Sequence, residues 1–242
     1  MKAMIFAAGL GTRLRPLTND RPKALVEVKG TPLLEITIKR LIHFGVKEII
    51  INVHHFADKI QQFLKENNDF GIRIVTSHEV EMPLETGGGL KKAAWFFDDG
   101  KPFFICNADI LSDIDLNKMY AAHSKSDAIA TFAIQKRDTS RYMLHDTEGV
   151  LCGWMNTKTK TIKMGRFAAE QGMYSFSCFH VVNPEIFKTT PDESFFTIID
   201  WYLRICNEHT IMGYRHDNDI WCDIGKPETL LEAAGIVDKL KF

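Results

Sequence analysis

The sequence predicts an α/β fold with a mostly parallel sheet flanked by helices and a β-rich half inserted after it. Through the first half, apolar runs typical of buried strands alternate with segments of helical period, which is the pattern of βαβ units. After residue 126, strand-like runs follow one another with short connections, which favours antiparallel pairs. No linker or repeat divides the 242 residues. We therefore expect one domain, 1–242, with halves of about 1–126 and 127–242.

The first half alternates strands and helices in chain order. The helix expected at 32–44 has apolar residues at helical spacing and ends at Gly45. Three glycines, Gly87 to Gly89, precede another helical segment and indicate a close approach of the backbone to something. Strands are expected at 2–8, 47–53, 72–76 and 102–106, and helices at 32–44, 56–68 and 90–97.

The second half is expected to be mostly strands. A turn at Glu148-Gly149 separates two of them, and Pro227 opens the last helix near its first turn. Strands are expected at 128–134, 142–145, 150–154 and 220–224, and helices at 195–206 and 227–240.

Composition excludes several classes of protein. Apolar residues make up 45% of the chain and charged residues 25%, which is the ordinary globular range, and the net charge is −1. We therefore expect no binding to nucleic acid through bulk charge and no membrane span, and nothing in the sequence indicates a protein partner. The five cysteines are widely spaced without a Cys-x-x-Cys pair, which argues against disulfides and favours a cytoplasmic location.

The glycine-rich segment after the first expected strand predicts an anion site. Gly9 and Gly11 let backbone N–H groups turn toward an anion without an intervening Cβ. Residues 13–23 hold three arginines and Lys23 against one aspartate, although the chain as a whole is balanced in charge. The alternative is a tight turn between strand and helix with solvated arginines. A polyphosphate is the ligand that the combination favours.

Two familiar phosphate loops do not fit this segment. A dinucleotide fingerprint needs a third glycine where Leu14 stands, and residues 28–31 lack the acid that would bind a ribose. A Walker A loop needs Gly-Lys-Ser or Gly-Lys-Thr, which the chain lacks. A nicotinamide-dependent oxidoreductase is therefore not favoured.

A different signature does match. Gly-x-Gly-Thr-Arg-Leu-Arg-Pro-Leu-Thr at 9–18, followed by Arg-Pro-Lys-Ala-Leu at 21–25, resembles the signature of sugar-1-phosphate nucleotidylyltransferases. The resemblance implies a Rossmann-like nucleotide-diphospho-sugar transferase fold whose first half binds a nucleoside triphosphate and whose second half binds a sugar 1-phosphate. It implies that Arg13 and Lys23 are catalytic. It also implies a nucleotide cradle that comprises Ala8, Gly9, Gly11, Thr12 and Arg13.

Later segments extend the resemblance. Residues 83–90 are similar to the family's nucleobase loop, which implies nucleotide-binding roles for Glu85, Thr86, Gly87, Gly88 and, farther along, Asn107. Asp109 ends an apolar strand, where an α/β sheet presents its ligands. Asp223 lies in a segment that resembles the family's late W-x-D-x-G-x-P-E-x-L motif.

The two aspartates predict a magnesium site. Either one alone is more often a turn or cap residue, but two at strand ends in two family motifs favour ligation. Few carboxylates, with phosphates completing the coordination shell, suit Mg²⁺ rather than zinc, and Asp109 is also expected to be catalytic. The family usually has Gly-Asp where this chain has Ala108-Asp109, so the backbone before the ligand is bulkier than usual.

The resemblance places sugar recognition in the second half. By position it implies sugar-binding roles for Gly153, Glu170, Ser177 and Asp200, although the family's frequent Glu-Lys-Pro is absent. The reaction it implies is an in-line attack of the sugar phosphate on the α-phosphorus with release of pyrophosphate.

The substrates are inferred from smaller features. Glu85, the compact length and the lack of a C-terminal β-helix are most similar to the N-acetylmuramic acid 1-phosphate uridylyltransferases of cell-wall recycling, which use UTP. GTP with mannose or heptose 1-phosphate is the alternative. A regulatory member of the fold without catalysis is a further alternative, which the retention of Arg13, Lys23 and both aspartates disfavours.

Overall fold

The computed structural model describes residues 1–240, and these form two compact units. Unit 1 comprises Met1–Leu84, Phe104–Ile114 and the chain from Asp219 onward, and unit 2 comprises Glu85–Phe103 and Asp115–Asn218. The expected α/β class is confirmed, but the units do not meet at a single point near residue 126. Asp223 belongs to unit 1, not to the second half, because its strand pairs with a strand near residue 110.

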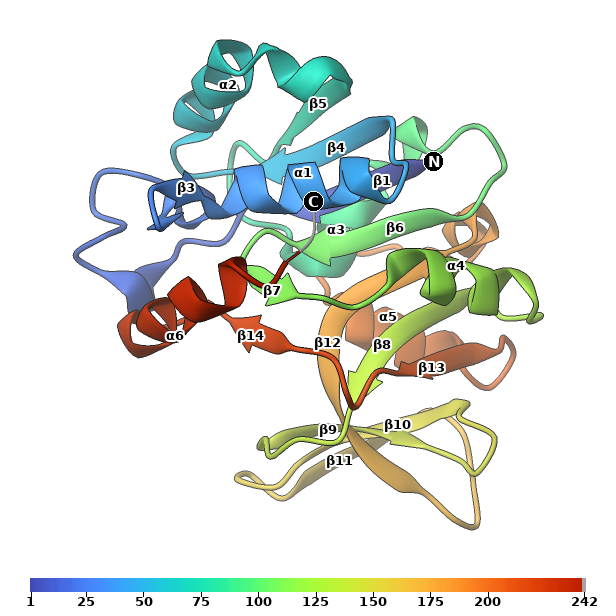
Figure 1. Ribbon diagram of the computed structural model, residues 1–242. Helices are drawn as coiled ribbons and strands as arrows, with labels where there is room; N and C mark the ends of the chain where they lie inside the picture. The colour runs from blue at the N-terminus through green and yellow to red at the C-terminus, as the bar shows by residue number, and fades with distance from the viewer. Residues whose placement is uncertain (241–242) are drawn as a thin grey trace. The chain divides into compact units, whose positions relative to one another are not determined.

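Unit 1 is built on parallel strands in the order β6 (Phe103–Asn107), β1 (Lys2–Phe6), β4 (Glu48–Val53) and β5 (Arg73–His78). Strands β1, β4 and β6 are mostly buried and apolar, which is typical of a parallel sheet covered on both faces, whereas the edge strand β5 is more exposed. Helix α1 (Leu33–His43) lies across β1 and β4 in Figure 1. It buries its apolar stripe and ends before Gly45, as the sequence predicts.

Smaller elements complete unit 1. The described strands include two short antiparallel pairs, and a turn of 3-10 helix comes after the loop that follows β1. The helices are α2 (Ala57–Glu66) and α6 (Pro227–Val237), the 3-10 turns are η1 (Thr12–Leu14), η2 (Lys23–Leu25) and η3 (Asn68–Gly71), and the strand pairs are β2 (Glu27–Val28) with β3 (Thr31–Pro32) and β7 (Ile110–Ser112) with β14 (Trp221–Asp223).

Unit 2 holds the β-rich part of the chain. Its strands run in the order β11, β10, β9, β12, β8 and β13, and every neighbouring pair is antiparallel except β8 with β13. The bounds are β8 (Ala130–Gln135), β9 (Arg141–His145), β10 (Leu151–Asn156), β11 (Thr161–Met164), β12 (Gly172–Val182) and β13 (Ile211–Arg215). The remaining elements are α3 (Glu85–Lys92), η4 (Ala94–Phe96), α4 (Leu116–Ser124), η5 (Pro184–Thr189) and α5 (Ile198–Ile205).

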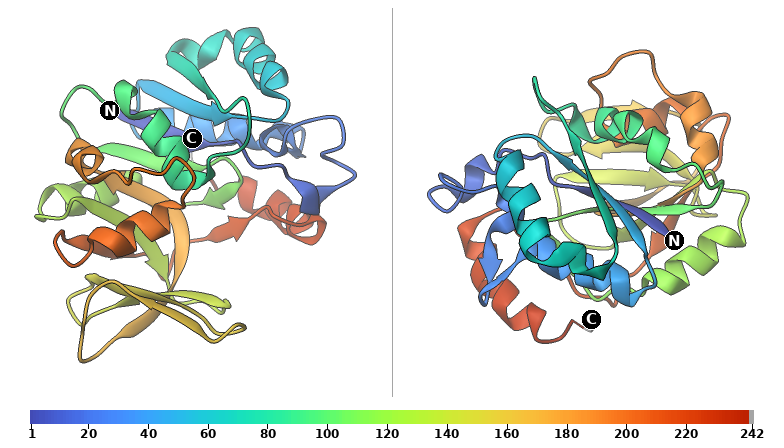
Figure 2. Two further views of the ribbon diagram at one scale, coloured as in Figure 1. Left: turned by 180° about the vertical axis from the view of Figure 1, so that it is seen from behind. Right: turned by 90° about the horizontal axis from the view of Figure 1, so that it is seen from above.

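Two helices cover opposite faces of this sheet. His123 on α4 is 2.8 Å from the hydroxyl of Thr131, and Tyr202 on α5 stacks on the ring of Phe132. Because successive residues of a strand point to opposite faces, α4 and α5 must lie on different sides of β8. Figure 2 shows α5 on the side seen from behind.

The structure bears on the cysteines and on membrane spanning. All five cysteines are free, as their spacing predicts. Within residues 1–240, no helix has both the length and the apolar character needed to cross a membrane.

Candidate active site

The loop after β1 is anchored by Leu14. This side chain is fully buried in an apolar cluster that includes Val26 and Ile224. The preceding residues of the same 3-10 turn, Thr12 and Arg13, are exposed. One buried leucine thus fixes the turn while its polar neighbours face outward.

Gly11 allows this loop to approach Lys23. Its φ is +63°, in the left-handed region that favours glycine, and a Cβ there would lie 3.0 Å from both Lys23 Cβ and Thr18 Cγ2. The Thr18 hydroxyl donates to the Gly11 carbonyl at 2.9 Å. By contrast, a Cβ on Gly9 would have no neighbour within 4 Å. Gly11 is therefore required by packing within the protein, whereas the space beside Gly9 is open.

Lys23 interacts with both predicted metal-binding carboxylates. Its ammonium forms an ion pair with Asp109 and lies 3.9 Å from Oδ1 of Asp223. The Lys23 side chain is only 13% exposed, so this charge cluster is partly shielded from water. Shielding strengthens such interactions relative to those of surface ion pairs.

A short antiparallel pair of strands brings the two aspartates together. Asp109 follows β6 and precedes β7, and Asp223 ends β14 opposite Ile110. The N–H of Ile224 also donates to the Asp109 carbonyl at 2.9 Å. The β7–β14 ladder therefore joins residues that are far apart in the sequence.

Arg13 reaches the same place. A Cβ built on Gly225 would lie 3.2 Å from Arg13 Nη2 and 3.0 Å from Asp223 Oδ1. The guanidinium and the carboxylate thus both lie beside Gly225. Unit 1 therefore gathers Arg13, Lys23, Asp109 and Asp223, the residues predicted to act on phosphate and metal.

The donor set at this point suits a hard cation that shares its ligands with a substrate. Asp109 and Asp223 offer carboxylate oxygens, and within residues 1–240 no group of three or more His, Cys, Asp and Glu side chains could hold a metal. Mg²⁺ is typically held by one or two carboxylates together with substrate phosphates and water, whereas zinc sites need more protein ligands.

The predicted nucleobase segment forms part of a helix instead of a loop. Gly87 and Gly88 were expected in a loop before a helix at 90–97, but α3 already begins at Glu85 and includes them. Their N–H groups donate to the Phe196 carbonyl at 3.0 and 3.1 Å, and a Cβ on Gly87 would lie 2.4 Å from the Phe196 ring. The close approach that these glycines permit is thus to another part of unit 2.

Other predicted nucleotide-binding residues have varied surroundings. Thr86 accepts a hydrogen bond from the N–H of Ile198 at 2.9 Å, which ties the starts of α3 and α5 together. Glu85 is exposed and has φ +61°, a conformation that costs a non-glycine residue roughly 1–2 kcal/mol. Ala8 is buried in the loop after β1, and Asn107 is half-buried at the end of β6.

Two of the predicted sugar-binding residues, Ser177 and Gly153, pack within unit 2. Ser177 is fully buried, and its hydroxyl is 2.8 Å from Nε2 of His216. A Cβ on Gly153 would lie 2.7 Å from the carbonyl oxygen of Lys163 on the adjacent strand. Burial removes Ser177 from contact with a ligand at the surface, and close strand packing explains Gly153.

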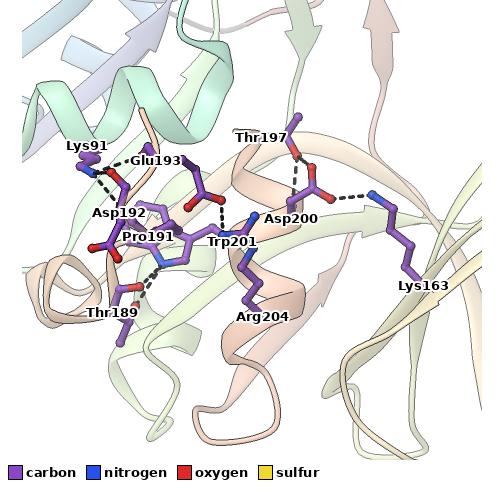
Figure 3. A network of polar contacts seen from close by, with 10 residues as sticks. All are labelled: Lys91, Lys163, Thr189, Pro191, Asp192, Glu193, Thr197, Asp200, Trp201 and Arg204. Carbon is purple, nitrogen blue, oxygen red and sulfur yellow. Dashed lines mark hydrogen bonds and ion pairs between the residues drawn. The ribbon is translucent and has the colours of Figure 1, made fainter. Parts of the chain in front are cut away.

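The other two predicted sugar-binding residues are at least partly exposed. Glu170 is exposed between β11 and β12. Asp200, on α5, accepts hydrogen bonds from Lys163 and from the Thr197 hydroxyl, both at 2.7 Å (Figure 3). Burial alone would raise the pKa of Asp200, but these two hydrogen bonds outweigh it and lower the pKa. Asp200 is therefore a carboxylate held in a fixed orientation.

Two buried polar residues of unit 1, Asn52 and Glu79, were not among the residues predicted from the sequence. Asn52 is the one polar residue among the buried positions of β4, 49–53. A buried polar residue in a strand of a parallel sheet needs hydrogen-bond partners, and that is the signal by which Asn52 could have been found.

Comparisons with known proteins show the family to which the chain belongs. The chain is 35% identical over 240 residues to N-acetylmuramate alpha-1-phosphate uridylyltransferase of Caulobacter vibrioides, covering 96% of this chain and 94% of that protein. It is 28% identical over 236 residues to mannose-1-phosphate guanyltransferase beta-B of Xenopus laevis, covering 96% of this chain and 63% of that protein.

A solved structure shares the fold. A putative glucose-1-phosphate thymidylyltransferase from Bacillus anthracis superposes with a TM-score of 0.81 at 16% identity, covering all of this chain and 97% of that one. The nucleotidyl transferase family pattern matches residues 2–239. The chain therefore belongs to the nucleotidyl transferase family, and it is an enzyme of the sugar-1-phosphate nucleotidylyltransferase class.

Proposed function

We propose that this enzyme transfers a uridylyl group from UTP to N-acetylmuramic acid 1-phosphate in a reaction that depends on Mg²⁺. The observation that carries the chemistry is the meeting of Arg13, Lys23, Asp109 and Asp223 in unit 1. The choice of substrates is supported by the Caulobacter relative, which is similar along nearly the whole of both chains.

In this reaction a phosphate oxygen of the sugar 1-phosphate attacks the α-phosphorus of the nucleotide. A new P–O bond forms there, the bond to the β-phosphate oxygen breaks, and pyrophosphate leaves with the electron pair. The attacking phosphate is already an anion, so no protein base has to remove a proton. Catalysis then depends on positioning and on neutralising negative charge.

The residues of the chain have separate tasks. Arg13, exposed on its 3-10 turn, neutralises the β- and γ-phosphates and the leaving pyrophosphate. Lys23, held between two carboxylates, donates to an oxygen of the α-phosphate or of the incoming sugar phosphate. The backbone of Ala8, Gly9, Gly11 and Thr12 forms the cradle, and the open space beside Gly9 supports this assignment.

Asp109 and Asp223 would hold Mg²⁺. A magnesium ion bound there would supply positive charge to phosphate oxygens of the nucleotide. Both aspartates lie near one cation, the Lys23 ammonium, and this supports their joint assignment as metal ligands.

Substrate selection is assigned to less central residues. Glu85, Thr86 and Asn107 are proposed to face the nucleotide base and ribose, and Glu170 and Asp200 the sugar. The alternative is GTP with mannose or heptose 1-phosphate, and the Xenopus relative, similar over 96% of this chain, supports the mannose form of it. A non-catalytic role would not require both carboxylates to be kept beside Arg13 and Lys23.

Pyrophosphate release tests the proposal directly. The enzyme is assayed with UTP, GTP, dTTP and CTP, each against N-acetylmuramic acid, N-acetylglucosamine, mannose and heptose 1-phosphates, with Mg²⁺ and with excess chelator. We expect the fastest turnover with UTP and N-acetylmuramic acid 1-phosphate, abolished by the chelator. Preference for GTP with mannose or heptose 1-phosphate would support the alternative, and turnover unaffected by chelation would rule out the metal assignment.

A further inference from the structure

A series of hydrogen bonds through two buried side chains runs through unit 1, from the phosphate loop to the start of the nucleobase segment. The N–H of Ala7 donates to Oδ1 of Asn52 at 2.8 Å. Nδ2 of Asn52 donates to Oε1 of Glu79 at 2.8 Å, and Oε2 of Glu79 accepts from the N–H of Leu84 at 2.8 Å. Ala7 directly precedes Ala8 and Gly9, and Leu84 directly precedes Glu85.

Glu79 is anchored independently of these contacts. Its N–H donates to the Val53 carbonyl at 2.8 Å, and its own carbonyl lies 2.6 Å from Nδ1 of His54, which must therefore be the donor. Asn52 and Glu79 are buried residues, only 3% and 1% exposed. Water cannot replace a lost partner at such positions without cost, so the direction of each hydrogen bond is fixed.

The donor and acceptor at each hydrogen bond of this series follow from the groups at its two ends. The N–H groups of Ala7 and Leu84 can only donate, and the Asn52 amide has one acceptor and one donor group. Once Oδ1 of Asn52 faces Ala7, its Nδ2 must face an acceptor, and the N–H of Leu84 needs a second one. A carboxylate at position 79 supplies both acceptors, whereas a glutamine would place a donor against a donor.

We propose that Glu79 and Asn52 are positioning residues that fix Leu84 relative to Ala7 and thereby set the affinity for the nucleoside triphosphate. Neither side chain touches substrate. They act through the backbone that leads into the cradle on one side and into Glu85 and Thr86 on the other. The inference rests on the proposed function, because it assigns these two segments to the nucleotide.

The test swaps the amide of Asn52 and the carboxylate of Glu79 between the two positions. In Glu79→Gln one donor faces another, and in Asn52→Asp two carboxylates face each other. In the double variant, the carboxylate introduced at position 52 accepts from the N–H of Ala7 and from the amide introduced at position 79. The carbonyl of that amide accepts from the N–H of Leu84, so every hydrogen bond is restored. The side chains keep nearly the same size and shape throughout.

The wild type is first assayed with UTP, GTP, dTTP and CTP, and the nucleotide that gives the fastest turnover is used. Each single variant should raise the KM for this nucleotide about tenfold or more, because a buried donor or acceptor loses its partner. The KM for the sugar 1-phosphate should change little. The double variant should recover the wild-type nucleotide KM to within about threefold, whereas independent effects would multiply.

Hydrogen exchange gives a readout that does not depend on activity. The amides of residues 80–90 should exchange faster in each single variant and regain protection in the double variant. If the single variants lower the melting temperature but leave the nucleotide KM unchanged, or if the double variant is worse than both, the inference is wrong. Absence of turnover by the wild type with every nucleotide would instead refute the proposed function. Hydrogen exchange would then still show whether the double variant restores the hydrogen bonds between Ala7 and Leu84.

Discussion

A Cβ atom built on Gly11 would lie 3.0 Å from the Cβ atom of Lys23, at a backbone φ of +63°. The phosphate loop and the lysine are therefore packed so closely that a methyl group on Gly11 would force its neighbours to shift. Gly11→Ala should lower both the melting temperature and the turnover, because the left-handed conformation alone costs alanine roughly 1–2 kcal/mol. Gly9→Ala is the matched stability control, because its Cβ would meet nothing within 4 Å. Equal melting temperatures for the two variants, measured by calorimetry, would contradict this packing.

Loss of one charge from the central cluster should abolish activity without unfolding the protein. Arg13→Ala and Asp109→Asn are each expected to reduce kcat by on the order of a hundredfold or more, roughly 3 kcal/mol, as for other preorganised charges. Asp58→Asn, at an exposed position in the first turn of α2, is the control and should keep full activity. Retention of more than a tenth of wild-type kcat by either active-site variant would refute its catalytic role.

Ser177 should matter for stability and not for the sugar. Its hydroxyl is fully buried beside His216, so Ser177→Ala is expected to lower the free energy of unfolding by about 1–3 kcal/mol. The KM for the sugar 1-phosphate should stay at the wild-type value. Ser124→Ala, on the exposed side of α4, should change neither quantity. A selective rise in the sugar KM for Ser177→Ala would instead show that Ser177 contributes to sugar binding.

Buried histidines in unit 2 should make the protein sensitive to acid. Burial lowers the pKa of His145 to about 4 and that of His180 to about 3, whereas both would titrate near 6.5 in the unfolded chain. Between these values the unfolded state binds protons that the folded state does not, so stability should fall as the pH drops from about 6.5 toward 4.

Denaturant unfolding across this pH range measures the effect. His145→Gln, which does not titrate, should flatten part of the decline. Surface carboxylates titrate mostly at lower pH and should not obscure it. A wild-type free energy of unfolding that stays constant between pH 6.5 and 4.5 would show that the histidines contribute nothing.

Much of the fold could be predicted because its signals are local. The expected strands at 2–8 and 47–53 and the helix at 32–44 match β1, β4 and α1 to within a few residues. Strand β12 was missed. Its register shifts between Phe176 and His180, where Cys178 has φ +62°, and such a bulge interrupts the alternation by which a strand is recognised.

The site was predictable in its chemistry and less so in its geometry. Residue types and motif spacing indicated Arg13, Lys23, Asp109 and Asp223, but only the β7–β14 ladder brings the aspartates together. A helix through Gly87 could not be predicted, because glycine disfavours helices. Glycine is needed at this position because the Phe196 ring, far away in the sequence, packs against it. Asn52 and Glu79 were missed because they bind each other and the backbone N–H groups of Ala7 and Leu84, and sequence alone does not bring these groups together.

The interleaving of the two units affects the order in which the protein can be assembled on the ribosome. The chain crosses between them four times, and Asp223 returns to unit 1 after more than a hundred residues of intervening chain. Synthesis runs from the N-terminus, so a nascent chain that already carries Arg13, Lys23 and Asp109 has no second carboxylate until residues 219–223 have emerged. Closing so long a loop is entropically costly and slow, so the phosphate-handling centre should be among the last features of the protein to form.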